Sequence, residues 1–190
     1  MTNLQAKAKM KEYLKAHFIK YREDIDNGVS RYSILFEGYD FCPDKVLEAC
    51  IWFYSDFMEC RVYYDCNASK WCRESEHRGE LMRLLNYCNA NVWISTEDGM
   101  NGTLYHPNYL YTPRFYITED GAFDITMTSI IPLDLYEMAP LETEDYFTAA
   151  CPELLNRLSA PIFYVLLGRI NAEQGILMIK KEIFGESEPV

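Results

Sequence analysis

The pattern of apolar and polar residues changes its period several times along the chain, and each period predicts one kind of element. Residues 3–22 place apolar side chains at steps of four, four and three, which is the spacing of one face of an amphipathic helix. These side chains are Met10, Leu14, Phe18 and Tyr21. Because Asn27-Gly28 ends the segment with residues that tolerate positive φ, we expect one helix over residues 3–22.

From residue 33 the period changes to two, which predicts strands over 33–37, 46–54 and 57–65. These segments are rich in β-branched and aromatic residues, and the third alternates cleanly. It places Met58, Cys60, Val62 and Tyr64 on one face, and Glu59, Arg61, Tyr63 and Asp65 on the other. The short connections predict an antiparallel meander with one face exposed to water.

Helical spacing returns after Ser75, a capping residue, in a stripe formed by Leu81, Leu84, Leu85 and Cys88. Strands are expected again over 92–96, 114–118 and 122–129, with a tight hairpin at Asp120-Gly121 between the last two. After Pro140, Thr143 and the acids that follow it predict a helix start, and Pro152 should bend or shorten that helix.

The end of the chain predicts two helices in series. Ser159 and Pro161 open the first helix and Gly168 closes it, while Asn171-x-x-Gln174 is a capping-box-like start for the last helix. The predicted order is α-βββ-α-βββ-αα. This order favours a single α+β domain over residues 1–190, with helices flanking an antiparallel sheet.

Composition fits one hydrophobic core, since 49% of the 190 residues are hydrophobic. The longest uncharged apolar run, Ala160–Gly168, is too short to span a bilayer, and the N-terminus lacks the features of a secretory signal. We therefore expect a cytoplasmic protein without a membrane partner. The seven cysteines are an odd number, which favours reduced, buried thiols over a disulfide framework.

Charge narrows the range of partners. The net charge of −11 repels a phosphate backbone, and no stripe of Lys or Arg offsets it, so nucleic acid is not expected as a partner. A basic protein surface is the partner that this charge favours.

Candidate metal ligands occur in one stretch. Cys60, Cys66, Cys72 and His77 provide four ligands that a tetrahedral zinc ion accepts. Paired Cys-x-x-Cys motifs are absent, and Cys60 lies on the apolar face of a predicted strand, so buried thiols are the favoured interpretation and no metal is expected.

Signatures of catalysis and of cofactor binding are weak. His17 has the helical spacing of a packed residue, and His106 precedes a proline in a loop. The acids at 97–98, 119–120 and 142–145 fit turns and a helix start, and the glycine cluster Asp98–Gly102 lacks a phosphate-binding pattern. We expect no catalytic residue and no cofactor, and therefore a protein that is not an enzyme.

Tyrosine is over-represented, with 15 residues. Tyr105, Tyr109 and Tyr111 cluster in one predicted loop, and Tyr63 lies on the outward face of its strand. Tyrosine offers a large contact area with a polar tip, so these four residues are candidate protein-binding anchors. The alternative is that the loop tyrosines pack on their own hairpin.

In three segments the sequence resembles the YbjN-like proteins, a bacterial family that shares its fold with type III secretion chaperones. These segments are the helix 78–89, the Asp-Gly hairpin within 115–125, and the helix, glycine and helix restart within 164–175. The resemblance implies a sheet with flanking helices, often dimeric, that holds or regulates other proteins without catalytic residues. The tyrosine-rich insert Leu104–Pro113 and the seven cysteines depart from the family pattern.

We therefore expect a chaperone-like or regulatory module that binds another protein through its sheet, a helical groove or the tyrosine-rich loop, with a homodimer as the further partner. Two alternatives stay open. The first is an immunity-type protein that neutralises a basic toxin or effector, steered by charge. The second is a small enzyme or metal-binding regulator that uses the scattered Cys and His residues.

Overall fold

The computed structural model describes residues 1–92, 95–97, 105–107 and 111–185. Its centre is a six-stranded antiparallel sheet with the strand order β1-β2-β3-β4-β8-β7. The strands are β1 (Tyr21–Asp26), β2 (Val29–Glu37), β3 (Val46–Phe53), β4 (Phe57–Tyr64), β8 (Ile125–Pro132) and β7 (Arg114–Ile117). A separate pair consists of β5 (Ser95–Glu97) and β6 (Tyr105–Pro107).

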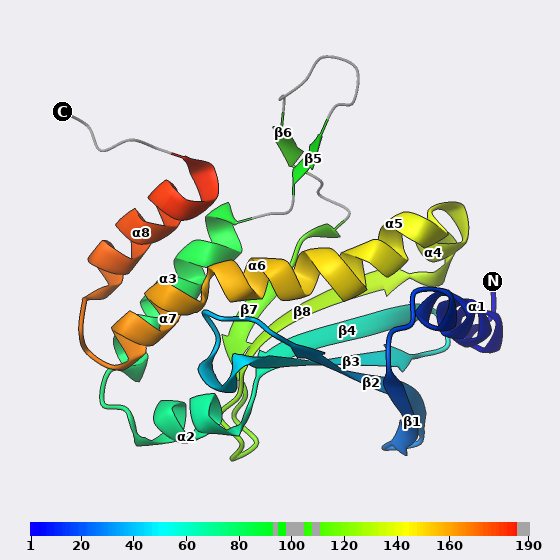
Figure 1. The fold of residues 1–190 in the computed structure, drawn as a ribbon, viewed down its shortest axis with the longest axis horizontal. Helices are drawn as coiled ribbons and strands as arrows, with labels where there is room; N and C mark the ends of the chain where they lie inside the picture. The colour runs from blue at the N-terminus through cyan, green and yellow to red at the C-terminus, as the bar shows by residue number, and fades with distance from the viewer. Residues whose placement is uncertain (93–94, 98–104, 108–110, 186–190) are drawn as a thin grey trace.

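The helices flank this sheet, which confirms the predicted α+β class. They are α1 (Asn3–Ala16), the 3-10 turn η1 (Pro43–Lys45), α2 (Cys66–Glu74), α3 (Arg78–Asn91), α4 (Leu133–Met138), α5 (Pro140–Asp145), the π-helical turn η3 (Tyr146–Ala150), α6 (Cys151–Arg157), α7 (Ser159–Leu166) and α8 (Ala172–Phe184). Figure 1 shows α1 and the α4–α7 run along one face of the sheet, whereas α3 packs against β7 and α8 packs against α3 and α7.

The predicted helix over residues 3–22 is confirmed over residues 3–16 and is wrong after Ala16. Helix α1 ends at Ala16, and the chain turns at Phe18, which has a φ of 56° and is 91% exposed. Tyr21 then begins β1, which returns through the two-residue turn Asn27-Gly28 to β2. Phe18 and Tyr21 fit the helical spacing by chance, although they follow the end of the helix. The sequence of β1 did not signal a strand, because it has few of the β-branched residues typical of strands.

A second correction concerns residues 66–74, which form α2 where no helix was predicted. Asp65 ends the strand and caps this helix, accepting a hydrogen bond of 2.7 Å from the backbone N–H of Cys66. The next helix, α3, begins at Arg78, three residues after the predicted cap Ser75.

The α5–α6 run passes through Pro152 without breaking. Proline has no backbone N–H, so a regular i→i−4 hydrogen bond to Thr148 cannot form there. Just before it, the N–H of Cys151 donates to the carbonyl of Tyr146, five residues back, which is the bond of a π-helical turn. The helix also begins at Pro140 rather than at Thr143, whose hydroxyl donates to the carbonyl of Ala139.

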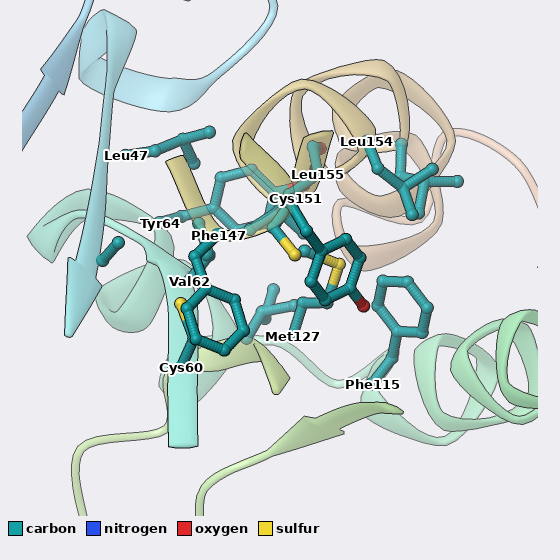
Figure 2. Packing of buried hydrophobic residues seen from close by; sticks show 14 of the residues in the cluster. Leu47, Cys60, Val62, Tyr64, Phe115, Met127, Phe147, Cys151, Leu154 and Leu155 are labelled. Carbon is teal, nitrogen blue, oxygen red and sulfur yellow. Dashed lines mark hydrogen bonds between the residues drawn. The ribbon is translucent and has the colours of Figure 1, made fainter. Parts of the chain in front are cut away.

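Alternation along β4 is confirmed, and it places the core between the sheet and the helices. Met58, Cys60, Val62 and Tyr64 are at most 1% exposed. Figure 2 shows Cys60, Val62 and Met127 of the sheet packed under Cys151 and Leu155 of α6. Tyr64 donates a hydrogen bond of 2.7 Å to the carbonyl of Leu155, which ties the strand to the helix above it.

The predicted helix ends near the C-terminus are also confirmed. Gly168 follows α7 with a φ of 67°, and Asn171 and Gln174 form a complete capping box at the start of α8. Of the seven cysteines only Cys66 is exposed, and the other six are buried.

Candidate functional site

The face of the sheet opposite α1, α6 and α7, which we call the outer face, carries most of the polar side chains of the strands. Figure 1 shows no helix along this face within the described part of the chain. The register aligns its residues in rows, and one row crosses all six strands. This row contains Arg22, Ser33, Cys50, Arg61, Thr128 and Arg114.

At the centre of the outer face, Trp52 lies between two arginines. The guanidinium carbons of Arg31 and Arg61 lie 5.4 Å and 4.8 Å from the centroid of the indole ring. The indole Nε1 donates a hydrogen bond of 2.9 Å to Asp26. Trp52 is only 6% exposed, so the two cations cover the ring and gain cation–π attraction at a partly desolvated site.

Carboxylates hold both arginines in place. Arg31 binds Asp24 through two hydrogen bonds, of 2.8 Å and 3.0 Å, and this lowers the pKa of Asp24. Arg61 donates to Glu59 at 2.7 Å, and the hydroxyl of Thr128 donates to the same oxygen at 3.3 Å. The two guanidinium groups are therefore fixed before any partner arrives.

Next to Arg61 in the same row, the buried thiol of Cys50 lies among polar groups. Its Sγ lies 3.4 Å from the hydroxyl of Ser33 and 3.5 Å from that of Tyr63, and it donates to Glu48 at 3.8 Å. Burial raises the pKa of Cys50 and of Tyr63, so both groups stay protonated at neutral pH. A protonated, buried thiol is a poor nucleophile, and this cluster is better suited to fixing side chains than to covalent chemistry.

Two apolar side chains of the outer face are open to water. Leu35 on β2 is 61% exposed and Ile130 on β8 is 51% exposed. Leu35 borders a shallow hollow of about 560 Å³, which is lined by Lys20, Tyr21, Arg22, Ser33, Leu35, Glu37 and Glu48. The outer face thus combines fixed cations, half-buried tyrosines and exposed aliphatic groups.

The four predicted tyrosines do not form one site. Tyr63 lies on the outer face, as predicted, and is half-buried. Tyr111 is 6% exposed, its hydroxyl is 3.1 Å from that of Thr143, and its ring centroid is 4.7 Å from that of Tyr146. Tyr111 is therefore a core residue, and the prediction that it is an exposed anchor is wrong.

The remaining two tyrosines belong to the predicted loop. Tyr105 lies in β6, opposite Glu97 in the register of the small sheet. Tyr109 lies outside the described residues.

The structure does not bring the candidate zinc ligands together. Cys60 faces the core from β4, Cys66 is exposed at the start of α2, and Cys72 lies on the buried side of α2. Among the described residues, no group of three or more His, Cys, Asp or Glu side chains could hold a metal ion. His17, which was expected to pack at the edge of the core, is exposed at the C-terminal end of α1, where its ring contacts that of Tyr13 with centroids 4.1 Å apart.

Sequence reasoning missed most of the outer face. Asp24, Arg31 and Trp52 lie on three neighbouring strands, and the strand that carries Asp24 was not predicted, because residues 3–22 were expected to form one helix. Once β1 is recognised, the Asn27-Gly28 turn places Asp24 directly opposite Arg31.

No helix within the described ranges combines the length and the apolar character needed to cross a bilayer. Comparisons of the chain with protein-family models, with curated proteins and with solved structures gave no match.

Proposed function

We propose that this protein is a non-enzymatic module that binds another protein through the outer face of its sheet. The observation that carries the proposal is the group Arg31, Trp52 and Arg61, in which both cations are stacked on the indole and bonded to carboxylates. Because these side chains are already fixed, they lose little conformational entropy when a partner binds.

The residue types of the outer face support this proposal. Arg, Tyr and Trp are enriched among residues that dominate binding energy at protein interfaces. Arg61, Tyr63 and Tyr116 lie in adjacent rows of this face, and Leu35 and Ile130 add exposed apolar area at two ends of it. The resemblance of the sequence to YbjN-like proteins points to the same class of function, a chaperone-like or regulatory protein of the bacterial cytoplasm.

Site-specific photo-cross-linking in the native host tests the proposal. A photoreactive amino acid replaces Leu35 or Ile130 on the outer face, and Leu177 on α8 is the matched control because it is 59% exposed. We expect the two outer-face positions to capture the same second protein and the control position to capture none of it. Arg61→Ala should lower the yield by about tenfold or more, since such anchors commonly contribute more than 1 kcal/mol.

The opposite pattern contradicts the proposal. Capture of one protein from Leu177 but not from Leu35 or Ile130 would place the binding surface on the helices. A yield that is unchanged by Arg61→Ala in a folded protein would remove the central group from the site.

A second candidate, the neutralisation of a basic protein, is favoured by the distribution of acids. Residues 115–156 contain no Lys or Arg, and their acids are Glu119, Asp120, Asp124, Asp134, Glu137, Glu142, Glu144, Asp145 and Glu153. Within this segment Met138 and Leu141 are 83% and 54% exposed beside exposed carboxylates of α4 and α5. A photoreactive residue at Met138 would then capture a basic protein, and Glu142→Lys would weaken that capture and its dependence on salt.

A further inference from the structure

The two edges of the main sheet differ. At one edge, both backbone groups of Phe115 in β7 are hydrogen-bonded to the side chain of Asn89: its carbonyl accepts from the amide and its N–H donates to it. At the other edge, β1 has β2 as its single neighbour among the described strands, and Figure 1 shows it at the end of the sheet. An edge strand of this kind can pair with another strand.

The turn between β1 and β2 determines which backbone groups reach the free edge. Asn27 and Gly28 have φ values of 48° and 82°, so they form a two-residue turn closed by the hydrogen-bonded pair Asp26 and Val29. Hydrogen-bonded and non-hydrogen-bonded pairs alternate in an antiparallel ladder. The N–H and C=O groups of Tyr21, Glu23 and Ile25 therefore point away from β2.

A second copy of β1 fits this edge in an antiparallel register with its two-fold axis at Glu23. On the outer face this register places Arg22 opposite Asp24 of the second copy, and Lys20 opposite Asp26, each twice. On the helix-covered face it places Tyr21 opposite Ile25, again twice. Opposite charges and apolar groups that face each other across strands stabilise pairing.

The two Glu23 residues on the axis are the like-charge pair in this register. Each Glu23 is already bound by two lysines of α1, Lys7 at 2.7 Å and Lys11 at 3.3 Å, and these lower its pKa. The contact on the axis is therefore not one between two bare carboxylates. The register also explains why Ile25, on the helix-covered face of the sheet, is 74% exposed in a single chain.

We infer that the β1 edge is a self-association surface, through which two copies join their sheets into one. This inference does not depend on the proposed partner at the outer face. Charged edges usually discourage pairing, but in this register the charges of β1 lie opposite charges of the other sign in a second copy of the same strand, except at Glu23 on the axis. Because about six residues per copy form the contact, it lies at the weak end of specific interfaces, and the dimer should dissociate on dilution.

Mass measurement by light scattering over a range of concentrations provides the first test. We expect a mass that rises from 22.3 kDa toward twice that value with concentration. Ile25→Asp should remove the rise, whereas the matched substitution Leu177→Asp on α8 should leave it intact. A wild-type chain that stays monomeric, or an Ile25→Asp variant that dimerises like the wild type, overturns the inference.

Cysteine cross-linking tests the register, in a Cys66→Ser background that removes the exposed thiol. Glu23→Cys places two thiols on the axis with Cα atoms about 5.5 Å apart, within disulfide range. Ile25→Cys places them about 14 Å apart along the strands. Under mild oxidation, we expect a covalent dimer from Glu23→Cys and none from Ile25→Cys, and the reverse result contradicts the two-fold axis at Glu23.

Discussion

The side-chain amide of Asn89 pairs with the backbone of Phe115 as a neighbouring strand would. Its Nδ2 donates to the carbonyl of Phe115 at 2.9 Å, and the N–H of Phe115 donates to its Oδ1 at 2.7 Å. Asn89 lies on α3, so these two bonds join that helix to the edge of the sheet. They also satisfy backbone groups of β7 that no further strand pairs with among the described residues.

We expect Asn89→Ala to lower the free energy of unfolding by about 1 to 3 kcal/mol, because it leaves two partly buried backbone groups without partners. Asn89→Asp should not restore stability, since a carboxylate accepts from the N–H of Phe115 but cannot donate to its carbonyl. Urea unfolding followed by circular dichroism measures both. Equal stability of all three proteins would mean that water replaces the amide at no cost.

Gly168→Ala should destabilise the protein for two separable reasons. Gly168 has a φ of 67°, which costs a residue with a Cβ about 1 to 2 kcal/mol. A Cβ at this position would also overlap the imidazole ring of His77. Thermal unfolding of Gly168→Ala and of the double variant with His77→Ala should show partial recovery in the double variant. A double variant no more stable than Gly168→Ala would show that the ring moves aside freely.

Three buried aliphatic residues should each be costly to truncate. Leu84 and Ile179 are fully buried and Leu154 is 7% exposed, so alanine at each should cost about 2 to 5 kcal/mol. Leu177→Ala is the control, because Leu177 lies on the same helix as Ile179 and is 59% exposed. Denaturant midpoints that fall equally for Ile179→Ala and Leu177→Ala would contradict this assignment of the two faces of α8.

Glu144 should make stability depend on pH. It is 5% exposed, and burial raises its pKa, an effect partly offset by the 2.6 Å hydrogen bond from Tyr136 and by the charge of Lys9. The folded state therefore retains this proton more strongly than the unfolded state, whose glutamate has a pKa of 4.5. Ionisation of the buried Glu144 therefore lowers the free energy of unfolding. This loss is absent below pH 4.5, grows between the unfolded and the folded pKa, and is complete above the folded pKa.

Glu144→Gln tests this expectation, since glutamine keeps an acceptor for Tyr136 and cannot ionise. Relative to the wild type, the variant should gain stability as the pH rises above 4.5, the pKa of the unfolded glutamate, because only the wild type then has to ionise a buried carboxyl group. A difference in unfolding free energy that does not change with pH would show that Glu144 titrates as it does in the unfolded chain.

Cys66 should be the reactive thiol of the native protein, because it is exposed and the other six are buried. Its hydrogen bond to Asp65 and the charge of that carboxylate raise its pKa, so the thiolate fraction near pH 8 is small. We expect one thiol per native chain to react with a disulfide reagent. Asp65→Asn should speed this reaction, and rapid labelling of several thiols in the native protein would contradict the burial of the others.

Periodicity predicted those parts of the fold in which burial dominates. The alternation of β4 and the ends of the last two helices are local signals, and each agrees with the structure because one face of each element lies in the core. Periodicity did not predict β1, and the reason is physical. As an edge strand it buries little, so the apolar residue Ile25 is exposed, and the two-residue turn Asn27-Gly28 rather than an apolar pattern marks its register.

The outer face could not be predicted from residues taken in order along the chain. Arg31, Trp52 and Arg61 come from three different strands and meet through the register alone. Tyr111 was expected to be exposed because it lies beside a loop. It is buried instead, through a contact with Tyr146, which is distant in the sequence.

Asn89 has a consequence for the extent of any assembly built from this chain. A sheet with two open edges can add copies at both ends and grow into a fibre. Here the side chain of Asn89 occupies the backbone of Phe115 at the β7 edge, so only the β1 edge is open. Two copies that pair through β1 therefore leave no open edge of this kind for a third copy. A polymer would require the amide of Asn89 to leave the backbone of Phe115, and the substitution Asn89→Ala would open that second end.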